Sequence, residues 1–333
     1  MCTHRSTTGC WRGVFEVELG PAALSVPRRL TKRLIEAGAK PGRYPSKLAR
    51  VSRTTRAEAA GGTAAGRALA TYLTKQIDNI FEGDLGLRRA SDPIHDTRVA
   101  IRRLRSTLRV FGKLLNESAN GDVDDELKWY AGLLGEVRDC QVQRRRFQEV
   151  LAQLPPELVL GPVANRIKTD LQSDQLRART RVAEAMNSQR YLDLLATLQR
   201  WRTDPPLAGP ASLDALNKRA RRAERKADRR LAQAIDAGDD ALLHRARKAA
   251  KRARYAAELR VPTDKRVKKT AKHYKKIQTV LGDHQDGVVA SGTILRLARI
   301  AGTTAGENGF TYGLLYAREQ QAAEEARTRV GNW

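Results

Sequence analysis

From about residue 58 onward, apolar side chains recur every three or four positions, the spacing of one face of an α-helix. The segments are long and rich in Ala, Leu, Arg and Glu, residues that favour helix. Prolines separate them, at positions 93, 155, 156, 162, 205, 206, 210 and 262. The pattern predicts an all-α fold for residues 58–333. Before it, VFEVEL (residues 14–19) alternates apolar and acidic positions like a half-buried strand.

Two of the predicted helices have well-defined apolar seams. The seam of the first consists of Ile101, Leu104, Leu108, Phe111 and Leu115. The seam of the second consists of Ala246, Ala250, Ala253 and Ala257. Alanine in the second seam indicates a close approach of the neighbouring helix. We expect residues 91–93, Ser-Asp-Pro, to form the cap and first turn of the first helix, and residues 239–240, Asp-Asp, to do the same for the second.

Both helices also carry a basic stripe with the same spacing: a histidine, a base three positions later, a pair at seven and eight, and an arginine at ten. The first stripe is His95, Arg98, Arg102, Arg103 and Arg105. The second is His244, Arg247, Lys251, Arg252 and Arg254. Offsets 0, 3, 7 and 10 lie within an arc of roughly 80° on a helix. Such rows of cations fit a long polyanion better than one small substrate.

A second pair of segments repeats as well. LGEVRD at 134–139 matches LGDHQD at 281–286 with an offset of 147 residues, and the two histidines are separated by 149. The nearly equal offsets predict an internal duplication, with related halves near 58–200 and 211–333.

Composition restricts the class of partner. The 333 residues include 62 Lys and Arg against 37 Asp and Glu, a net charge of +25. This excess indicates a polyanionic partner, namely polyphosphate, nucleic acid or an anionic membrane. The three cysteines, Cys2, Cys10 and Cys140, form neither a disulfide framework nor a metal-ligand pattern. With no apolar run of about 20 residues and no signal-peptide pattern at the N-terminus, we expect a cytoplasmic protein without membrane insertion.

The two histidine-headed stripes, together with LGEVRD and LGDHQD, resemble the hallmark motifs of the CHAD family, the conserved histidine α-helical domain. The resemblance covers roughly residues 58–333 and includes the order, spacing and duplication of the motifs. It implies two four-helix bundles related by pseudo-two-fold symmetry, with a basic central cleft that binds inorganic polyphosphate. Association with polyphosphate granules is a further expectation.

The preceding segment resembles the last strand and helix of a CYTH domain, which often precedes CHAD and forms a triphosphate tunnel. Glu16, Glu18 and Lys47 fit the end of the CYTH pattern. Most of the barrel is absent, so we expect residues 1–57 to be a partial CYTH-like α/β remnant and linker, in a truncated frame or a degenerate domain.

The candidate polyphosphate ligands are the basic residues of both stripes and their helical neighbours. They are His95, Arg98, Arg102, Arg103, Arg105, Arg109, His244, Arg247, Lys248, Lys251, Arg252, Arg254, Lys272 and Lys275. For the two histidines, phosphate contact and a structural role are equally supported. We expect Asp139 and Asp286 to position arginines, and the acidic run at 122–126 to begin a helix rather than bind metal.

The sequence contains no Walker loop, nucleophile elbow or metalloprotease helix. We therefore expect a non-enzymatic polyphosphate-binding protein that needs no cofactor or metal. Two alternatives stay open. One is a basic helical protein that binds DNA or RNA non-specifically, and weak nucleic-acid binding is also compatible with the first hypothesis. The other is a truncated CYTH–CHAD triphosphatase.

Overall fold

The computed structural model describes residues 4–5, 11–12, 32–38, 62–116 and 121–331. The chain divides into two compact units, Met1–Ala59 and Ala60–Trp333. In the first unit, the described residues include the antiparallel strands β1 (His4–Arg5) and β2 (Trp11–Arg12) and a helical turn over 32–36. The strand predicted over 14–19 lies outside the described residues, as does most of the segment that resembles a CYTH domain, including Glu16, Glu18 and Lys47.

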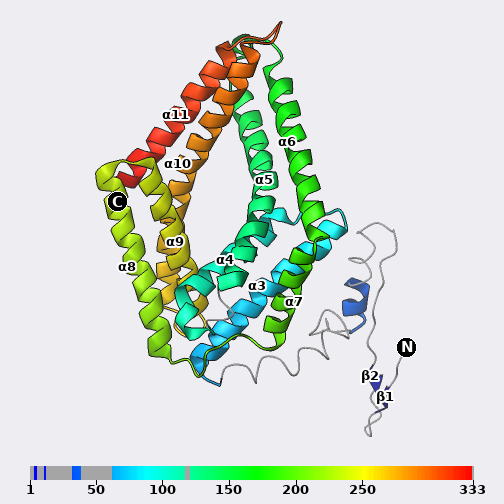
Figure 1. Ribbon diagram of the computed structural model, residues 1–333, viewed down its shortest axis with the longest axis vertical. Helices are drawn as coiled ribbons and strands as arrows, with labels where there is room; N and C mark the ends of the chain where they lie inside the picture. The colour runs from blue at the N-terminus through cyan, green and yellow to red at the C-terminus, as the bar shows by residue number, and fades with distance from the viewer. Residues whose placement is uncertain (1–3, 6–10, 13–31, 39–61, 117–120, 332–333) are drawn as a thin grey trace. The chain divides into compact units, whose positions relative to one another are not determined.

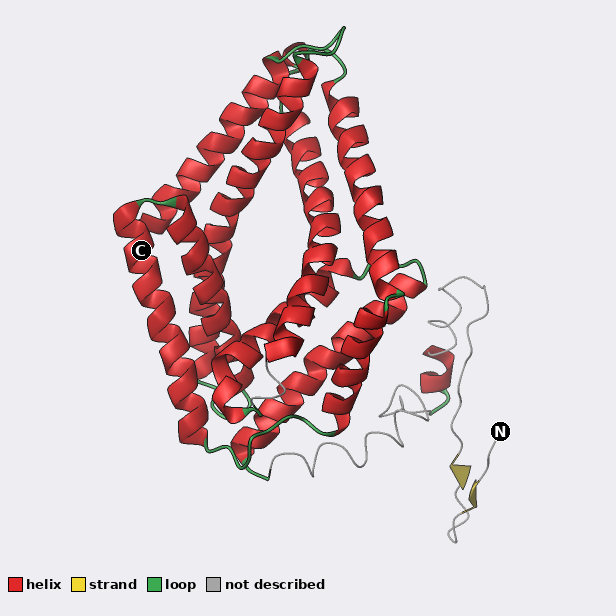
Figure 2. Ribbon diagram, in the orientation of Figure 1, coloured by secondary structure: helices red, strands yellow, loops and turns green. Residues whose placement is uncertain are grey.

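The second unit consists of α-helices joined by short loops (Figures 1 and 2), which confirms the all-α prediction. Its first half contains α3 (Ala64–Arg88), α4 (Ile94–Phe111), α5 (Gly121–Leu151), α6 (Val163–Met186) and α7 (Gln189–Thr203). Its second half contains α8 (Leu213–Ala237), α9 (Asp240–Arg260), α10 (Val267–Ala301) and α11 (Phe310–Gly331). Among the described residues, the short 3-10 helices η1 (Gly112–Leu114) and η3 (Pro156–Leu158) follow α4 and α5.

Both predicted seams are buried. Every seam residue of α4 and α9, including Leu115 just after η1, has an exposed fraction of 2% or less. The predicted cap of α9 is correct, since the Asp239 carboxylate accepts a hydrogen bond from the Leu242 amide at 2.7 Å. The predicted cap of α4 is wrong: Pro93 occupies the N-cap position and no side chain caps the helix. Ser91 instead donates its hydroxyl hydrogen to the Gly86 carbonyl at the end of α3.

Helices α4 and α9 pack against each other where the two halves meet. The core around α4 includes residues of α3, α5 and α7, and it extends to Leu216 of α8 and Leu259 of α9. A second core lies around α9 and is lined largely by alanines and by Tyr274, Ile277 and Leu281 of α10. The alanine seam thus brings α8, α9 and α10 close together, as the sequence predicts.

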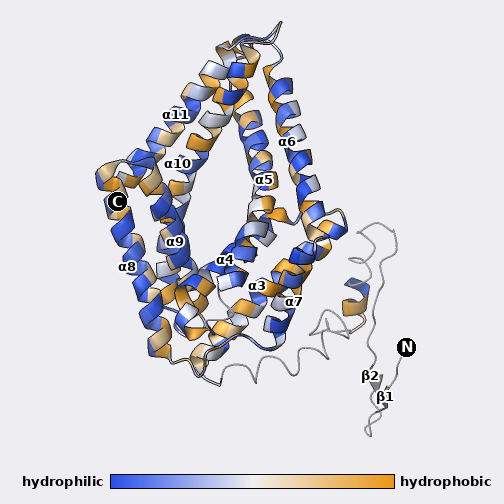
Figure 3. Ribbon diagram, in the orientation of Figure 1, coloured by the Kyte–Doolittle hydropathy of each residue, from blue (hydrophilic) through white to orange (hydrophobic). Residues whose placement is uncertain are grey.

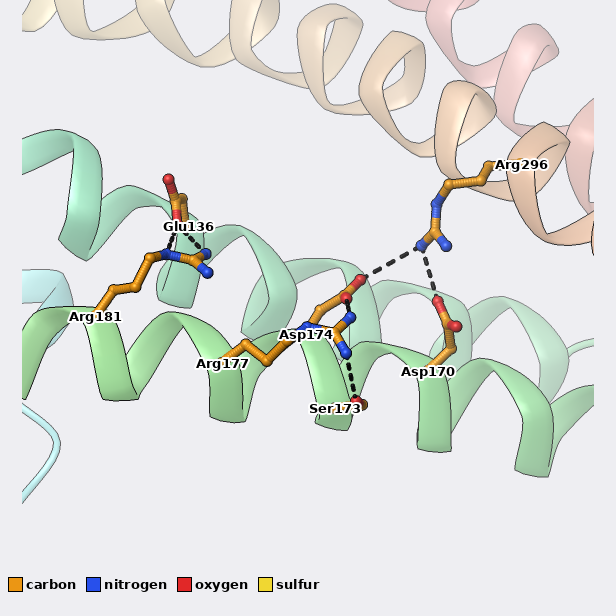
Figure 4. Close-up of polar contacts among 7 residues, drawn as sticks. All are labelled: Glu136, Asp170, Ser173, Asp174, Arg177, Arg181 and Arg296. Atoms are coloured by element: carbon orange, nitrogen blue, oxygen red, sulfur yellow. Dashed lines mark hydrogen bonds and ion pairs between the residues drawn. The ribbon is translucent and has the colours of Figure 1, made fainter.

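The hairpins α5–α6 and α10–α11 diverge beyond α4 and α9 and meet again at their tips (Figure 1). A separate apolar core joins the tips, with Phe147 and Ile167 from the first hairpin and Ile294 and Leu315 from the second. Ion pairs reinforce the junction: the Arg296 guanidinium on α10 lies 2.8 Å from Asp170 and 3.5 Å from Asp174 on α6 (Figure 4). The separation of α5 from α10 is therefore fixed at both ends.

Candidate functional site

The packing of α4 on α9 gathers four cations from the two stripes. Arg98 and Arg102 come from α4, and Arg247 and Lys251 come from α9. The guanidinium groups of the three arginines all lie close enough to Lys251 to lower the pKa of its amine electrostatically. We call these four residues the crossing cluster. The structure thus brings together residues that are about 150 positions apart in the sequence.

The crossing cluster is strained electrostatically. Burial, followed by the charges of Arg247 and Arg102, lowers the pKa of Lys251 to about 7. Burial is also the main cause that lowers the pKa of Arg102, and Arg98 and Arg247 add to it. The Nε atoms of Arg102 and Arg247 are buried and have no hydrogen-bond partner among the described residues. Cations held together in this way are a candidate site for an anion.

Matching contacts hold one arginine of the crossing cluster on each side. Arg98 donates to the Gly135 carbonyl at 3.1 Å and to the Asp139 carboxylate at 3.2 Å. Arg247 lies 3.8 Å from Asp286, and its guanidinium fits over Gly282, where an added Cβ would lie 3.2 Å from Nη2. Both candidate supporting carboxylates therefore stand beside an arginine of the crossing cluster.

The two histidines lie near the N-terminal ends of α4 and α9, close to this cluster. The pKa of His95 is lowered, first by desolvation and then by the charge of Arg138. The pKa of His244 is lowered, first by desolvation and then by Lys248, while a side-chain hydrogen bond with Gln285 acts in the opposite direction. Both imidazoles are therefore neutral at pH 7 and able to donate one N–H to an anion.

Arg103 and Arg254 belong to a different environment. Both bind the carboxylate of Glu258, at 3.1 Å and 2.8 Å, and both guanidinium groups lie over the ring of Tyr255. The hydroxyl of Tyr72 also donates to Glu258 at 3.4 Å. Because both arginines already bind a carboxylate within the protein, they are less available to a ligand than an unpaired cation. Glu258, which is 155 residues from Arg103, was not predicted from the sequence as a partner of this arginine.

The two ends of the basic stripe on α4 have different surroundings. Arg105 and Arg109, at its C-terminal end, both bind Asp124 in the first turns of α5, at 2.9 Å and 2.7 Å. Arg252 of α9 lies near them, since Arg109 and Arg105 lower its pKa after the larger effect of burial. The predicted acidic start of α5 is present, and Asp124 has the additional role of binding these arginines.

The remaining candidates, Lys248, Lys272 and Lys275, are exposed on α9 and α10. None of them forms an ion pair with another residue in the described part of the chain. Within that part, no three His, Cys, Asp or Glu side chains gather in a way that could hold a metal ion. No described helix combines the length and the apolar character needed to cross a membrane.

A comparison with protein families finds the CHAD domain over residues 71–295. The chain belongs to the CHAD family. Its crossing cluster therefore lies within the CHAD domain, and both histidine-headed helices, α4 and α9, fall inside the matched range.

Similar proteins and structures agree with this assignment. Two uncharacterized proteins of Mycobacterium tuberculosis, from strains CDC 1551 / Oshkosh and ATCC 25618 / H37Rv, are each 35% identical over 333 residues, which is 96% of this chain. The chain spans 64% of the length of these relatives. PptA from Streptomyces chartreusis has a similar fold, with a TM-score of 0.66 at 23% identity, covering 80% of this chain and 96% of that one. The CHAD domain from the plant Ricinus communis has a TM-score of 0.62 at 24% identity, with coverages of 82% and 96%.

Proposed function

We propose that this CHAD protein binds inorganic polyphosphate without catalysis, and that the crossing cluster is the centre of the site. The observation that carries the proposal is the gathering of Arg98, Arg102, Arg247 and Lys251. Among the described residues, the carboxylates that form ion pairs with this cluster are Asp139 and Asp286. Guanidinium groups suit phosphate because their planar N–H groups bind oxygens in pairs and stay charged after partial desolvation. The resemblance to CHAD proteins noted in the sequence implies the same ligand.

A chain of phosphates would relieve the repulsion within the cluster. Without a ligand, the cations repel one another, and this repulsion lowers the pKa of Lys251. Each bound phosphate would place negative charge between them, so the pKa of Lys251 would rise on binding. His95 and His244, at the starts of α4 and α9, would extend the site with neutral N–H donors. We place Lys248, Lys272 and Lys275 at its exposed edge.

The nucleic-acid alternative predicts a different kind of surface. Sequence-specific readers of duplex DNA place Asn, Gln or Arg against base edges. The segment from His95 to Arg109 contains no Asn or Gln, and the stripe from His244 to Arg254 contains none either. Non-specific contacts to a phosphate backbone use the same cations as polyphosphate, so the two ligands have to be compared directly.

The test is a charge reversal in the crossing cluster, Arg102→Glu combined with Lys251→Glu. The new carboxylates would lie near Arg98 and Arg247, so we expect the helical content to be unchanged. Binding of long-chain polyphosphate, measured by isothermal titration calorimetry at fixed ionic strength, should fall by at least 100-fold. The same titration with triphosphate, duplex DNA and single-stranded RNA gives the order of preference.

The matched control is Lys268→Glu with Lys269→Glu, which changes the net charge equally at two exposed positions of α10. It should weaken binding by less than threefold. Equal losses in both variants, or duplex DNA competing as well as polyphosphate at the same phosphate concentration, would contradict a specific site. Phosphate release from triphosphate or polyphosphate with Mg²⁺ or Mn²⁺, persisting after repurification, would contradict the non-enzymatic assignment.

A further inference from the structure

A second cationic region lies at the other end of α4. Here α4, η1, α8 and α9 enclose a cavity of about 550 Å³. Six cations line it, and the other lining residues are small or apolar. The cations are Arg109, Lys113, Arg219, Arg222, Lys226 and Arg252. No acidic side chain lines this cavity, which we call the α8 groove.

The cations of the α8 groove affect one another, as those of the crossing cluster do. The pKa of Lys226 is lowered, first by the charge of Arg230, with contributions from Arg252 and Arg222. Burial lowers the pKa of Arg252, and Arg109 is the next cause. One carboxylate in the vicinity, that of Asp124, binds Arg109. The groove therefore holds more positive charge than Asp124 neutralises.

The position that corresponds by sequence offset in the other half carries a carboxylate, so the two halves differ in charge here. With the 149-residue offset of the two histidines, Arg252 corresponds to Arg103, and Arg109 corresponds to Glu258. In that counterpart, Glu258 accepts hydrogen bonds from Arg103 and from Tyr72. Glu258 therefore pairs with cations in its half, whereas Arg109, at the corresponding position, adds positive charge to the α8 groove.

Helix α8 supplies cations to this groove with few acidic residues beside them. Its buried residues, Leu216, Ala220, Ala227 and Ala234, form a narrow stripe, and the helix is drawn mostly in blue, the colour of hydrophilic residues, in Figure 3. Arg222 and Lys226 are one turn apart, exposed, and without an ion pair among the described residues. Like charges at this spacing destabilise a helix slightly, and an anion bound between them would relieve that cost.

We infer that the α8 groove binds a second stretch of the polyphosphate chain, beyond the segment held by the crossing cluster. The inference rests on the proposed function. Arg98 and Arg109 lie on one helix, 11 residues or about 16 Å apart at 1.5 Å per residue, so one long polymer can reach both regions. Phosphoryl oxygens suit the groove because its polar lining is entirely cationic. A short oligomer occupies the crossing cluster alone, and a long one occupies both.

The test compares chain lengths in three double variants of the full chain. They are Arg222→Glu with Lys226→Glu in the groove, Arg102→Glu with Lys251→Glu in the crossing cluster, and Lys268→Glu with Lys269→Glu as the control. All three change the net charge equally. With triphosphate, the groove variant should bind like the unmodified protein. With long-chain polyphosphate, it should bind at least tenfold more weakly, whereas the control changes less than threefold.

The outcomes separate the two proposals. Equal loss in the groove variant and the control would overturn the α8 groove and leave the crossing cluster untouched. Loss of triphosphate binding in the groove variant, comparable to its loss of polymer binding, would also overturn it, because the groove would then be part of the first site. If the crossing variant binds both ligands normally while the groove variant binds neither, the proposed function of the crossing cluster fails instead. Circular dichroism of each variant establishes that the helices are intact.

Discussion

At the scale of single residues, Lys251 gives the strongest support for the proposed anion site. An amine in water keeps its charge well above pH 7, whereas burial among three guanidinium groups lowers the pKa of this one to about 7. A packing role alone would be served better by an uncharged side chain, because burying a cation without a partner costs free energy. The charge is therefore informative about function.

This environment predicts a pH dependence of binding. In the free protein Lys251 loses its proton as the pH rises through about 7, and bound phosphate oxygens would raise that pKa. The complex then holds a proton that the free protein has lost, so affinity falls as the pH rises above 7, by up to tenfold per unit. Calorimetry with long-chain polyphosphate between pH 7 and 9 measures this, and the terminal phosphates contribute little there.

The variant Lys251→Arg provides the decisive comparison, because a guanidinium stays protonated throughout that range. It should bind with nearly constant affinity between pH 7 and 9. Lys269→Arg, at an exposed position on α10, should keep the dependence of the unmodified protein. A slope that persists in Lys251→Arg would assign the titration to another group and contradict this role.

Single residues also mark the limit of what the sequence could predict. The positions of the stripes and of Asp139 and Asp286 followed from repetition. The partners of Arg103 and Arg105 did not, because Glu258 and Asp124 act across helix contacts rather than along a helix. One sign was available: Glu258 occupies the position that corresponds to Arg109, so the halves differ in charge at this place.

At the scale of helices, two glycines allow the arginines of the crossing cluster to lie flat against their neighbours. Gly135 of α5 and Gly282 of α10 are buried and correspond with an offset of 147 residues. A Cβ at either position would lie 3.2 Å from the Nη2 of Arg98 or of Arg247. The glycine of each LG motif therefore leaves room for the guanidinium group of an arginine in its own half.

Gly135→Ala should therefore weaken binding without unfolding the helix. Alanine favours a helix interior by roughly 1 kcal/mol over glycine, so thermal stability should be kept or slightly raised. The guanidinium of Arg98 must move, and we expect polyphosphate affinity to fall three- to tenfold. Gly132→Ala is the control, since it lies in the same helix and an added Cβ there meets nothing within 4 Å. Equal binding by the two variants would refute the positioning role.

Helices were the part of the fold most open to prediction from sequence. Apolar periodicity and prolines located them, and the seams of α4 and α9 are buried as expected. The first half nevertheless contains α7 in addition to its four longer helices, and Tyr191 and Leu198 of α7 join the core around α4. The junction of the hairpin tips was not predicted either, because it depends on contacts such as Arg296 with Asp170, 126 residues apart.

At the scale of the whole molecule, the net charge of +25 could attract a polyanion either as a uniform field or through particular clusters of cations. A generic polycation binds polyanions through all its exposed cations, and each of them contributes about equally to the release of counterions. The arrangement found here is uneven. Many arginines are paired one to one with carboxylates, such as Arg146 with Glu319 and Arg166 with Glu307. The four cations of the crossing cluster have the carboxylates of Asp139 and Asp286 beside them, and no carboxylate lines the α8 groove.

This contrast predicts how binding depends on salt. For single-stranded polyanions, the slope of log K against log salt is about −0.7 per phosphate neutralised. Four cations in the crossing cluster then predict a slope of about −3 for a short phosphate oligomer, and the α8 groove should make it steeper for a long one. Titrations from 50 to 300 mM KCl at pH 6.8 measure both slopes. Arg102→Gln should reduce the magnitude of either slope by about 0.7, and Lys269→Gln should leave both unchanged. If each substitution changes the slope equally, the charges act as a uniform field, and the localised sites proposed here do not exist.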